Sequence, residues 1–231
     1  MIDYNCYVGG WPFRKIRYKS FEDLKRLHAD NNIEGGFVSS TYSIFYNDPY
    51  EGDMDLRKEI TDDNYNLVLT VNPLLPGAVP SVKRGIDELN AKGVKVFPWF
   101  HDFDLNGREM KTLTDELRET NLPLFIVLRG DDERLQYMFS AKEVQIDALK
   151  KFLEGNKDLE IYLCNIRMNE VEQLKDQITS ISRLYFDFSG LKSGLFQNEQ
   201  LIEMGVAGKA RYGSMWPLNC MKSTVLSYNL K

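Results

Sequence analysis

The feature that most constrains the fold is a regular alternation of short apolar runs with amphipathic stretches along the whole chain. This rhythm predicts βαβ crossovers, and therefore a parallel sheet covered by helices. The runs predicted as strands are Ile2–Val8, Gly36–Ser40, Leu67–Asn72, Val94–Pro98, Leu124–Arg129, Ile161–Asn165, Leu184–Phe188 and Ala210–Ser214. The stretches predicted as helices are Phe21–Asn31, Leu56–Asn64, Val82–Ala91, Met110–Thr120, Val144–Leu153, Val171–Ile181, Asn198–Met204 and Met221–Leu230.

Two architectures fit such a chain: a closed barrel and an open doubly wound sheet. The first predicted strand runs into VGGWPF, which lacks the GxGxxG fingerprint, and Pro12 would interrupt a helix there. No linker rich in Pro, Gly or Ser divides the chain. The 231 residues give about 29 per unit, close to the ~30 of a βαβ motif. We therefore predict one (β/α)₈ TIM barrel over residues 1–231.

Charge and cysteine content exclude several function classes. The net charge is −5 with no basic tract, which argues against binding to nucleic acid or to an anionic membrane. Three widely spaced cysteines form neither a disulfide framework nor a metal knuckle, and no run approaches a membrane span. We expect a cytoplasmic protein, and a homo-oligomer remains open.

Polar residues gather where the predicted strands end, which is where (β/α)₈ barrels build their active sites. A pocket for a small anionic molecule is therefore expected at this mouth. The candidate binding residues are Asn5, Tyr7, Arg14, Asn72, Trp99, Asn165, Arg167 and Ser214, and the candidate catalytic residues are His101, Arg129 and Asp187.

Several segments resemble the amidohydrolase superfamily, in its amidohydrolase-related branch of metal-dependent hydrolases and decarboxylases. They are spread from the first predicted strand to the last, so the resemblance covers nearly the whole chain. The segments are IDYNCYVGGWPFR, TVNPLLPG, GVKVFPWFHDF, PLFIVLRGDDER, LYFDFSG and YGSMWPLN.

The resemblance implies a metal site that this sequence lacks. In the family, strand one carries a His-x-His pair, strands five and six each supply a His, and strand eight supplies an Asp; together they bind one or two divalent metals. The matching positions here are Asn5 and Tyr7, Leu128 or Arg129, Asn165, and Met215. These side chains are poor ligands for a dication, so we predict no catalytic metal and no other cofactor; the alternative is a single divalent metal such as zinc.

Each candidate catalytic residue also has a plainer interpretation. Asp187 could be an acid that faces the mouth or a buried carboxylate paired with a neighbouring arginine. His101 could be a general base, with Asp102 or Asp187 fixing its tautomer, or a loop histidine bonded to a carbonyl group. Arg129 could clamp a carboxylate or form an ion pair with Asp131, Asp132 or Asp187. The predicted function is hydrolysis of a small anionic ester or lactone without a metal. The alternative is a non-catalytic barrel that binds a ligand or a partner.

Overall fold

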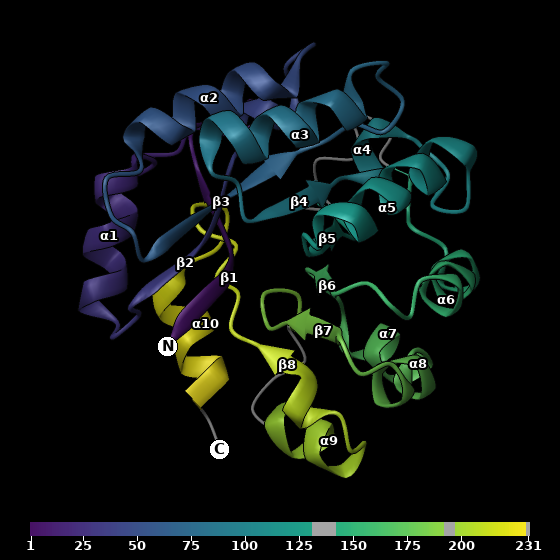
Figure 1. The fold of residues 1–231 in the computed structure, drawn as a ribbon. Helices are drawn as coiled ribbons and strands as arrows, with labels where there is room; N and C mark the ends of the chain where they lie inside the picture. The colour runs from purple at the N-terminus through teal and green to yellow at the C-terminus, as the bar shows by residue number, and fades with distance from the viewer. Residues whose placement is uncertain (131–141, 192–196, 230–231) are drawn as a thin grey trace.

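The computed structural model describes residues 1–130, 142–191 and 197–229, and it confirms the predicted barrel. Eight parallel strands follow one another in chain order around a single sheet. Figure 1 looks onto this ring of strands, with the helices arranged outside it. The strands are β1 (Ile2–Val8), β2 (Gly35–Ser40), β3 (Tyr65–Thr70), β4 (Gly93–Val96), β5 (Leu124–Val127), β6 (Ile161–Cys164), β7 (Leu184–Asp187) and β8 (Ala210–Arg211).

The ring closes between β1 and the residues that follow β8. The backbone N–H of Tyr4 donates to the Tyr212 carbonyl oxygen at 2.8 Å, and the Met215 N–H donates to the Asn5 carbonyl oxygen at 2.7 Å. Closure leaves no long free sheet edge here, and it brings the polar end of β1 beside the ends of β7 and β8.

The helices begin and end at recognisable signals. A capping box formed by Ser20 and Asp23 starts α1. Asn90 and Asn121, both with positive φ, end α3 and α5. The helices are α1 (Phe21–Asp30), α2 (Pro49–Glu59), α3 (Ala78–Leu89), α4 (Pro98–His101), α5 (Arg108–Thr120), α6 (Ile146–Gly155), α7 (Met168–Gln173), α8 (Lys175–Ser180), α9 (Gln197–Glu203) and α10 (Met221–Asn229), with 3₁₀ turns η1 (Tyr42–Ile44) and η3 (Ala207–Lys209).

Several predicted helices differ in their bounds from the observed ones. The second begins at Pro49 rather than Leu56, because Asp48 caps it and Pro49 suits its first turn. The predicted helix Val171–Ile181 is divided at Leu174 into α7 and α8. Leu230, the predicted end of the last helix, lies outside the described residues. No helix among the described residues is long and apolar enough to cross a membrane.

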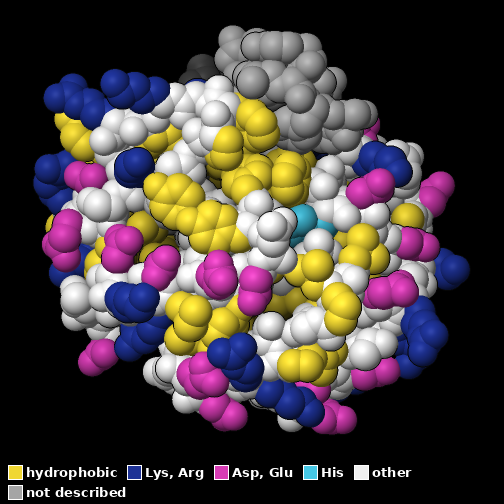
Figure 2. All heavy atoms as spheres, turned by 90° about the horizontal axis from the view of Figure 1, so that it is seen from above, with side chains coloured by type: hydrophobic (Ala, Val, Ile, Leu, Met, Phe, Trp, Pro, Cys, Tyr) yellow, Lys and Arg dark blue, Asp and Glu magenta, His cyan; other side chains and the backbone are white. Residues whose placement is uncertain are grey.

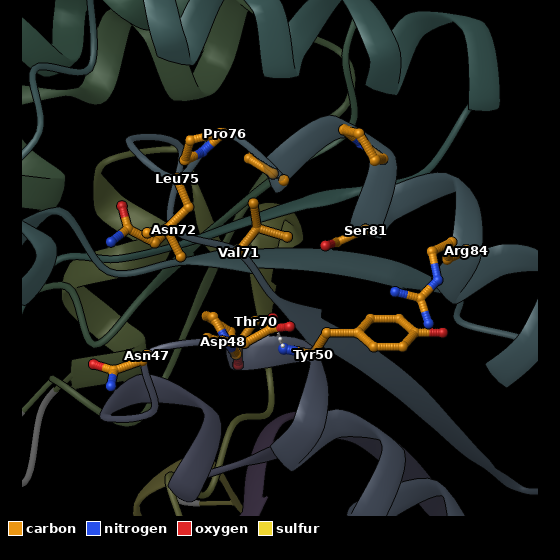
Figure 3. Close-up of a pocket in the computed structure, with 14 residues that line it drawn as sticks. Asn47, Asp48, Tyr50, Thr70, Val71, Asn72, Leu75, Pro76, Ser81 and Arg84 are labelled. Atoms are coloured by element: carbon orange, nitrogen blue, oxygen red, sulfur yellow. Dashed lines mark hydrogen bonds between the residues drawn. The ribbon is translucent and has the colours of Figure 1, made fainter.

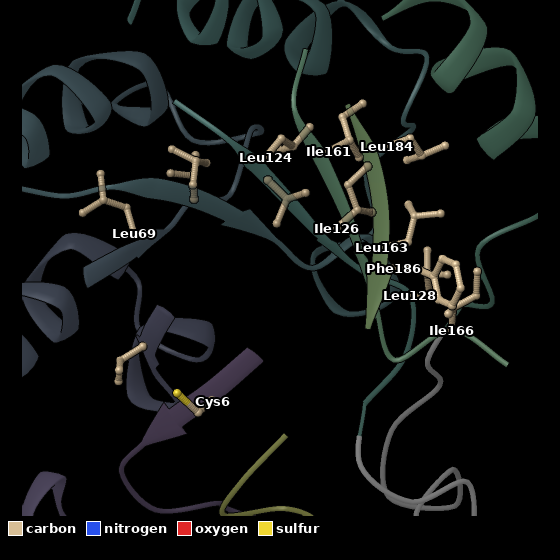
Figure 4. Close-up of a cluster of buried hydrophobic side chains, with 14 of the residues drawn as sticks. Cys6, Leu69, Leu124, Ile126, Leu128, Ile161, Leu163, Ile166, Leu184 and Phe186 are labelled. Carbon is tan, nitrogen blue, oxygen red and sulfur yellow. The ribbon is translucent and has the colours of Figure 1, made fainter. Parts of the chain in front are cut away.

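Two layers of apolar side chains hold the barrel together. Alternate strand residues such as Leu124, Ile126 and Leu163 belong to the larger cluster, which the helices cover (Figure 4). Their neighbours, including Phe125 and Tyr162, belong to a second cluster rich in aromatic rings. The alternation follows from the period-two geometry of strands, so the second cluster fills the barrel interior.

Candidate functional site

A buried chain of hydrogen bonds, from Lys95 through Asn5 to Asp187, connects three strands inside the barrel. Nδ2 of Asn5 donates to Oδ2 of Asp187 at 2.6 Å, and Nζ of Lys95 donates to Oδ1 of Asn5 at 3.0 Å. Asn5 lies on β1, Lys95 on β4 and Asp187 at the end of β7. All three side chains are at most 2% exposed. The chain therefore places a carboxyl group and an amine on opposite sides of one amide.

Asp187 is held by several donors. Its Oδ1 accepts hydrogen bonds from the Asn165 N–H at 2.9 Å, the Ser189 N–H at 3.0 Å and the Ser189 hydroxyl at 2.8 Å. Burial raises the pKa of Asp187 to about 6, and the bonds from Ser189, Asn165 and Asn5 oppose that rise. Gly213 leaves room for this carboxyl group, because a Cβ there would lie 2.7 Å from the Asp187 Cβ. A carboxyl group with this pKa can exchange a proton near neutral pH.

Lys95 is the functional candidate that sequence reasoning missed. Its side chain is fully buried, and among the described residues its one hydrogen bond is to Asn5. Its Nζ lies 4.3 Å from the centroid of the Tyr7 ring. Burial lowers the pKa of Lys95, whereas nearby Cys164, Cys6, Asp187 and Asp3 raise it. The available signal was the lone charge in the apolar run GVKVF, the same signal that singled out Arg129.

Three hydroxyl groups, one on each of β1, β2 and β3, have no hydrogen-bond partner among the described residues. They are Tyr7 Oη, Ser39 Oγ and Thr70 Oγ1, and all three are buried. The register places Tyr7 opposite Ser39, and Thr70 opposite Lys95. Paired residues of a parallel ladder face the same side of the sheet, so these hydroxyls share the interior with Lys95. Buried polar atoms normally have hydrogen-bond partners, and a bound molecule or water would supply partners for these three hydroxyl groups.

Arg129 is held in an ion pair. Its guanidinium group donates to Oε1 of Glu170 and to the carbonyl oxygen of Asn165. Asn165 in turn donates from its Nδ2 to the Arg129 carbonyl oxygen at 3.1 Å. Glu170 was not among the partners expected from the sequence; of those, Asp131 and Asp132 lie outside the described residues.

His101 lies at the rim, away from the buried chain. Its Nε2 lies 2.9 Å from the Ile44 carbonyl oxygen, so Nε2 carries the proton and donates it. Its Nδ1 is buried without a partner among the described residues. Burial lowers the pKa of His101, which keeps the ring neutral near pH 7. Neither expected orienting partner reaches it, since Asp102 pairs with Lys142 and Asp187 bonds elsewhere.

The structure separates the remaining predicted residues into two groups. Asn5, Tyr7 and Asn165 join the buried chain or lie beside it, and Trp99 packs over Gly130 at the mouth. The other four have contacts elsewhere. Arg14 donates to the Leu218 carbonyl oxygen, and Arg167 precedes α7. Ser214 Oγ accepts from the Trp216 N–H, and Asn72 Oδ1 accepts from the Leu74 N–H.

Asn72 lines a cavity of about 320 Å³ at the end of β3, between the starts of α2 and α3 (Figure 3). Tyr50 and Arg84 form its far wall, and the Arg84 guanidinium lies 4.3 Å from the centroid of the Tyr50 ring. The cavity therefore lies at the carboxyl end of β3, where residues of α2 and α3 line it.

An aromatic rim stands near the mouth. The Trp11 ring packs edge-to-face against Phe13 and Phe45, with centroids 5.9 and 5.2 Å apart. Phe45 packs in the same way on Phe100, at 4.9 Å. Hydrophobic side chains also gather beside a histidine on the face seen in Figure 2. Such a rim favours ligands with an apolar or aromatic body.

The residues at the family's metal positions do not fit a divalent metal. Asn5 is occupied by the Lys95 ammonium group and by Asp187, and Arg129 carries a permanent positive charge beside Asn165. The one carboxylate here, Asp187, already accepts hydrogen bonds on both oxygens. A donor set that contains an ammonium group and no imidazole is a poor match for zinc or manganese.

No family model and no curated protein matches the sequence. Solved structures do share the fold. An uncharacterized TIM-barrel protein from Bordetella bronchiseptica aligns with a TM-score of 0.72 and 15% identity, over 100% of this chain and 92% of its own. A dihydroxybenzoic acid decarboxylase from Polaromonas sp. JS666, with bound manganese and the inhibitor 2-nitroresorcinol, aligns with a TM-score of 0.70 and 11% identity, over 98% of this chain and 89% of its own.

Amidohydrolase 2 from Bifidobacterium longum subsp. infantis aligns with a TM-score of 0.65 and 15% identity, over 97% of this chain and 88% of its own. The resemblance noted in the sequence is thus confirmed at the level of the fold. This chain has the TIM-barrel fold of amidohydrolase-superfamily structures.

Proposed function

We propose that this protein is an amidohydrolase-related enzyme that hydrolyses a small anionic ester or lactone at the barrel mouth without a catalytic metal. The observation that carries the proposal is the buried amine of Lys95. An ammonium group with one neutral hydrogen-bond partner is costly to bury, and a bound anion would supply the missing acceptors.

Asp187 and Lys95 have separate roles in the proposed reaction. Asp187, with its pKa raised to about 6, accepts the proton of an attacking water. Lys95, whose Nζ lies over the Tyr7 ring, stabilises negative charge that develops on the attacked carbonyl oxygen. Asn5 fixes the separation of the two groups through its bonds to both. Lys95 thereby takes the role that the sequence suggested for Arg129, whose guanidinium group is engaged by Glu170.

His101 is proposed as a substrate contact at the rim. Its Nε2–H is committed to the Ile44 carbonyl oxygen, which leaves Nδ1 as an acceptor for a substrate donor. The aromatic rim around Trp11 and Phe45 would cover the apolar part of the molecule.

The second candidate is a non-catalytic ligand-binding protein. It is favoured by the separate contacts of His101, Arg129 and Asp187, which share no hydrogen bond with one another. Both candidates predict that a small anion binds near Lys95, and only the first predicts turnover.

The test is a hydrolysis screen of carboxylate-bearing esters and lactones with chelator-treated protein. The proposal expects turnover that survives chelation and falls about 100-fold or more in Lys95→Met, the range for loss of an oxyanion donor. Lys92→Met is the matched control, because Lys92 is exposed and its side chain bonds only to Asn90 among the described residues. Anion binding with no turnover would favour the second candidate, and turnover that appears only with added metal would overturn the proposal.

A further inference from the structure

A second cluster of polar side chains lies on the outer side of the barrel wall, between β1 and α1. Asp3 and Cys6 come from β1 and His28 from α1, and all three are fully buried. Their potential ligand atoms lie within 4.8 Å of one another. No part of the proposed hydrolysis uses them. We propose that Asp3, Cys6 and His28 form a structural zinc site.

The spacing of the His28 and Asp3 donor atoms, which are hydrogen-bonded here, matches that of two ligands on a tetrahedral metal. Nε2 of His28 lies 3.2 Å from Oδ2 of Asp3. Two ligands at about 2.0 Å from zinc, at the tetrahedral angle, are separated by roughly 3.3 Å. A cysteine, a histidine and a carboxylate also make up the mixed sulfur, nitrogen and oxygen set that zinc accepts.

The surrounding residues orient these ligands. Oδ1 of Asp3 accepts the N–H groups of Asn5 and Ser214, each at 3.0 Å, which turns Oδ2 toward His28. Nδ1 of His28 lies 3.0 Å from the Tyr65 hydroxyl, which leaves Nε2 for the metal. Supporting contacts of this kind fix metal ligands in known sites.

The backbone of β2 passes close to this cluster at Gly36. A Cβ at Gly36 would lie 2.8 Å from the Asp3 carbonyl oxygen and 3.1 Å from the Cys6 sulfur, so glycine keeps a side chain from crowding these two residues. The ladder between β1 and β2 is also irregular between Asp3 and Cys6, which brings both side chains to this one place. The Phe37 carbonyl oxygen, 3.4 Å from the Cys6 sulfur, is a candidate for the fourth position.

Zinc binding releases the thiol proton of Cys6: the S–H bond breaks, the proton goes to solvent, and the thiolate bonds to zinc. At His28 an Nδ1–H bond replaces any Nε2–H bond, so that Nε2 is free to bind zinc. The Tyr65 hydroxyl suits this exchange, because it can donate to a bare Nδ1 and accept from a protonated one. The ion would then tie α1 to the strand that closes the barrel.

The test is a titration of chelator-treated protein with Co²⁺ as the spectroscopic substitute for Zn²⁺. The proposal expects a thiolate-to-cobalt charge-transfer band that saturates at one ion per chain, is displaced by Zn²⁺, and disappears in Cys6→Ser and His28→Gln. Cys164→Ser is the matched control, since Cys164 is the other buried thiol and lies beside Asp187 inside the barrel.

Three results would overturn the zinc site: no band in the wild-type chain, a band that persists in Cys6→Ser, or a band lost only in Cys164→Ser. The wild-type titration needs no variant to fold, so the outcome is decisive even if His28→Gln is unstable. Lys95→Met should keep the band, which separates this site from the proposed hydrolytic site.

Discussion

Asn5 and Lys95 are joined by a 3.0 Å hydrogen bond across the barrel interior, from β1 to β4. Position 5 is where the family resemblance implies a metal-binding histidine. Here the amide oxygen accepts from an ammonium group instead, and the amide nitrogen donates to Asp187. The same place in the fold therefore presents the amine of a lysine side chain.

Replacing Lys95 by methionine should change stability in a pH-dependent way. The unfolded carboxyl group of Asp187 titrates near 3.8 and the folded one at about 6, so its ionisation lowers stability as pH rises through that window. Removing the ammonium group raises the pKa of Asp187 further, because the two charges attract. We expect Lys95→Met to match or exceed wild-type stability near pH 5 and to lose up to about 3 kcal/mol near pH 8.

Chemical denaturation of Lys95→Met and wild type at the two pH values measures this difference, with Lys92→Met as the control. A loss of the same size at both pH values would show that Lys95 and Asp187 are not coupled.

The buried carboxyl group of Asp53 should lower the stability of the fold as the pH rises. Burial raises its pKa to about 8, although the Ser43 hydroxyl and the Thr70 N–H donate to it at 2.7 and 2.8 Å. The pKa of Asp53 in the folded protein exceeds its ordinary value of 3.8, so stability falls as pH rises from about 4 through 8. Asp53→Asn should remove most of this slope, because an amide can still accept from Thr70 and donate to Ser43.

The melting temperature between pH 5 and pH 9 tests this expectation. Asp55→Asn is the control on the same helix, since Asp55 is exposed and pairs with Lys58. A wild-type slope that survives in Asp53→Asn would contradict the assignment.

The Arg129–Glu170 pair should be strongly coupled. Both side chains are mostly buried, at 21% and 11% exposure, and Arg129 also bonds to the Asn165 carbonyl oxygen. Removing one partner leaves the other charge without compensation, so each single alanine variant should cost about 2–4 kcal/mol. A double-mutant cycle by urea denaturation should give a coupling energy of about 1–3 kcal/mol. Additive single losses would show that the pair contributes no mutual stabilisation.

The fold was predictable because each strand has a local sequence signal, which is a short run of apolar residues. Runs such as LFIVL are apolar at every position, as strands buried on both faces require. The start of α2 was missed because its signal is Asp48–Pro49 rather than its apolar spacing. The burial of Asp53 was equally hard to foresee, because Asp53 lies in an acidic stretch and yet is 1% exposed.

The site was predictable only in part, because it depends on contacts between distant segments. Asn5 and Asp187 could be placed at strand ends, but their direct bond spans 182 positions of sequence. Nothing in the local pattern assigns Glu170 to Arg129, or His28 to Asp3, since each pair is made by the closed barrel. Lys95 carried a usable signal, which was a charge inside an otherwise apolar strand.

The central claim is that Lys95 makes this mouth an anion site that needs no metal. Calorimetric titration of chelator-treated protein with benzoate tests it most directly, because benzoate combines a carboxylate with a ring that suits the aromatic rim. We predict binding to wild type and to Lys92→Met without added metal, and a loss of at least about tenfold in affinity in Lys95→Met, as expected for a charge-assisted hydrogen bond. Binding that persists unchanged in Lys95→Met, or that requires added zinc or manganese in Cys6→Ser as well as in wild type, would contradict the claim.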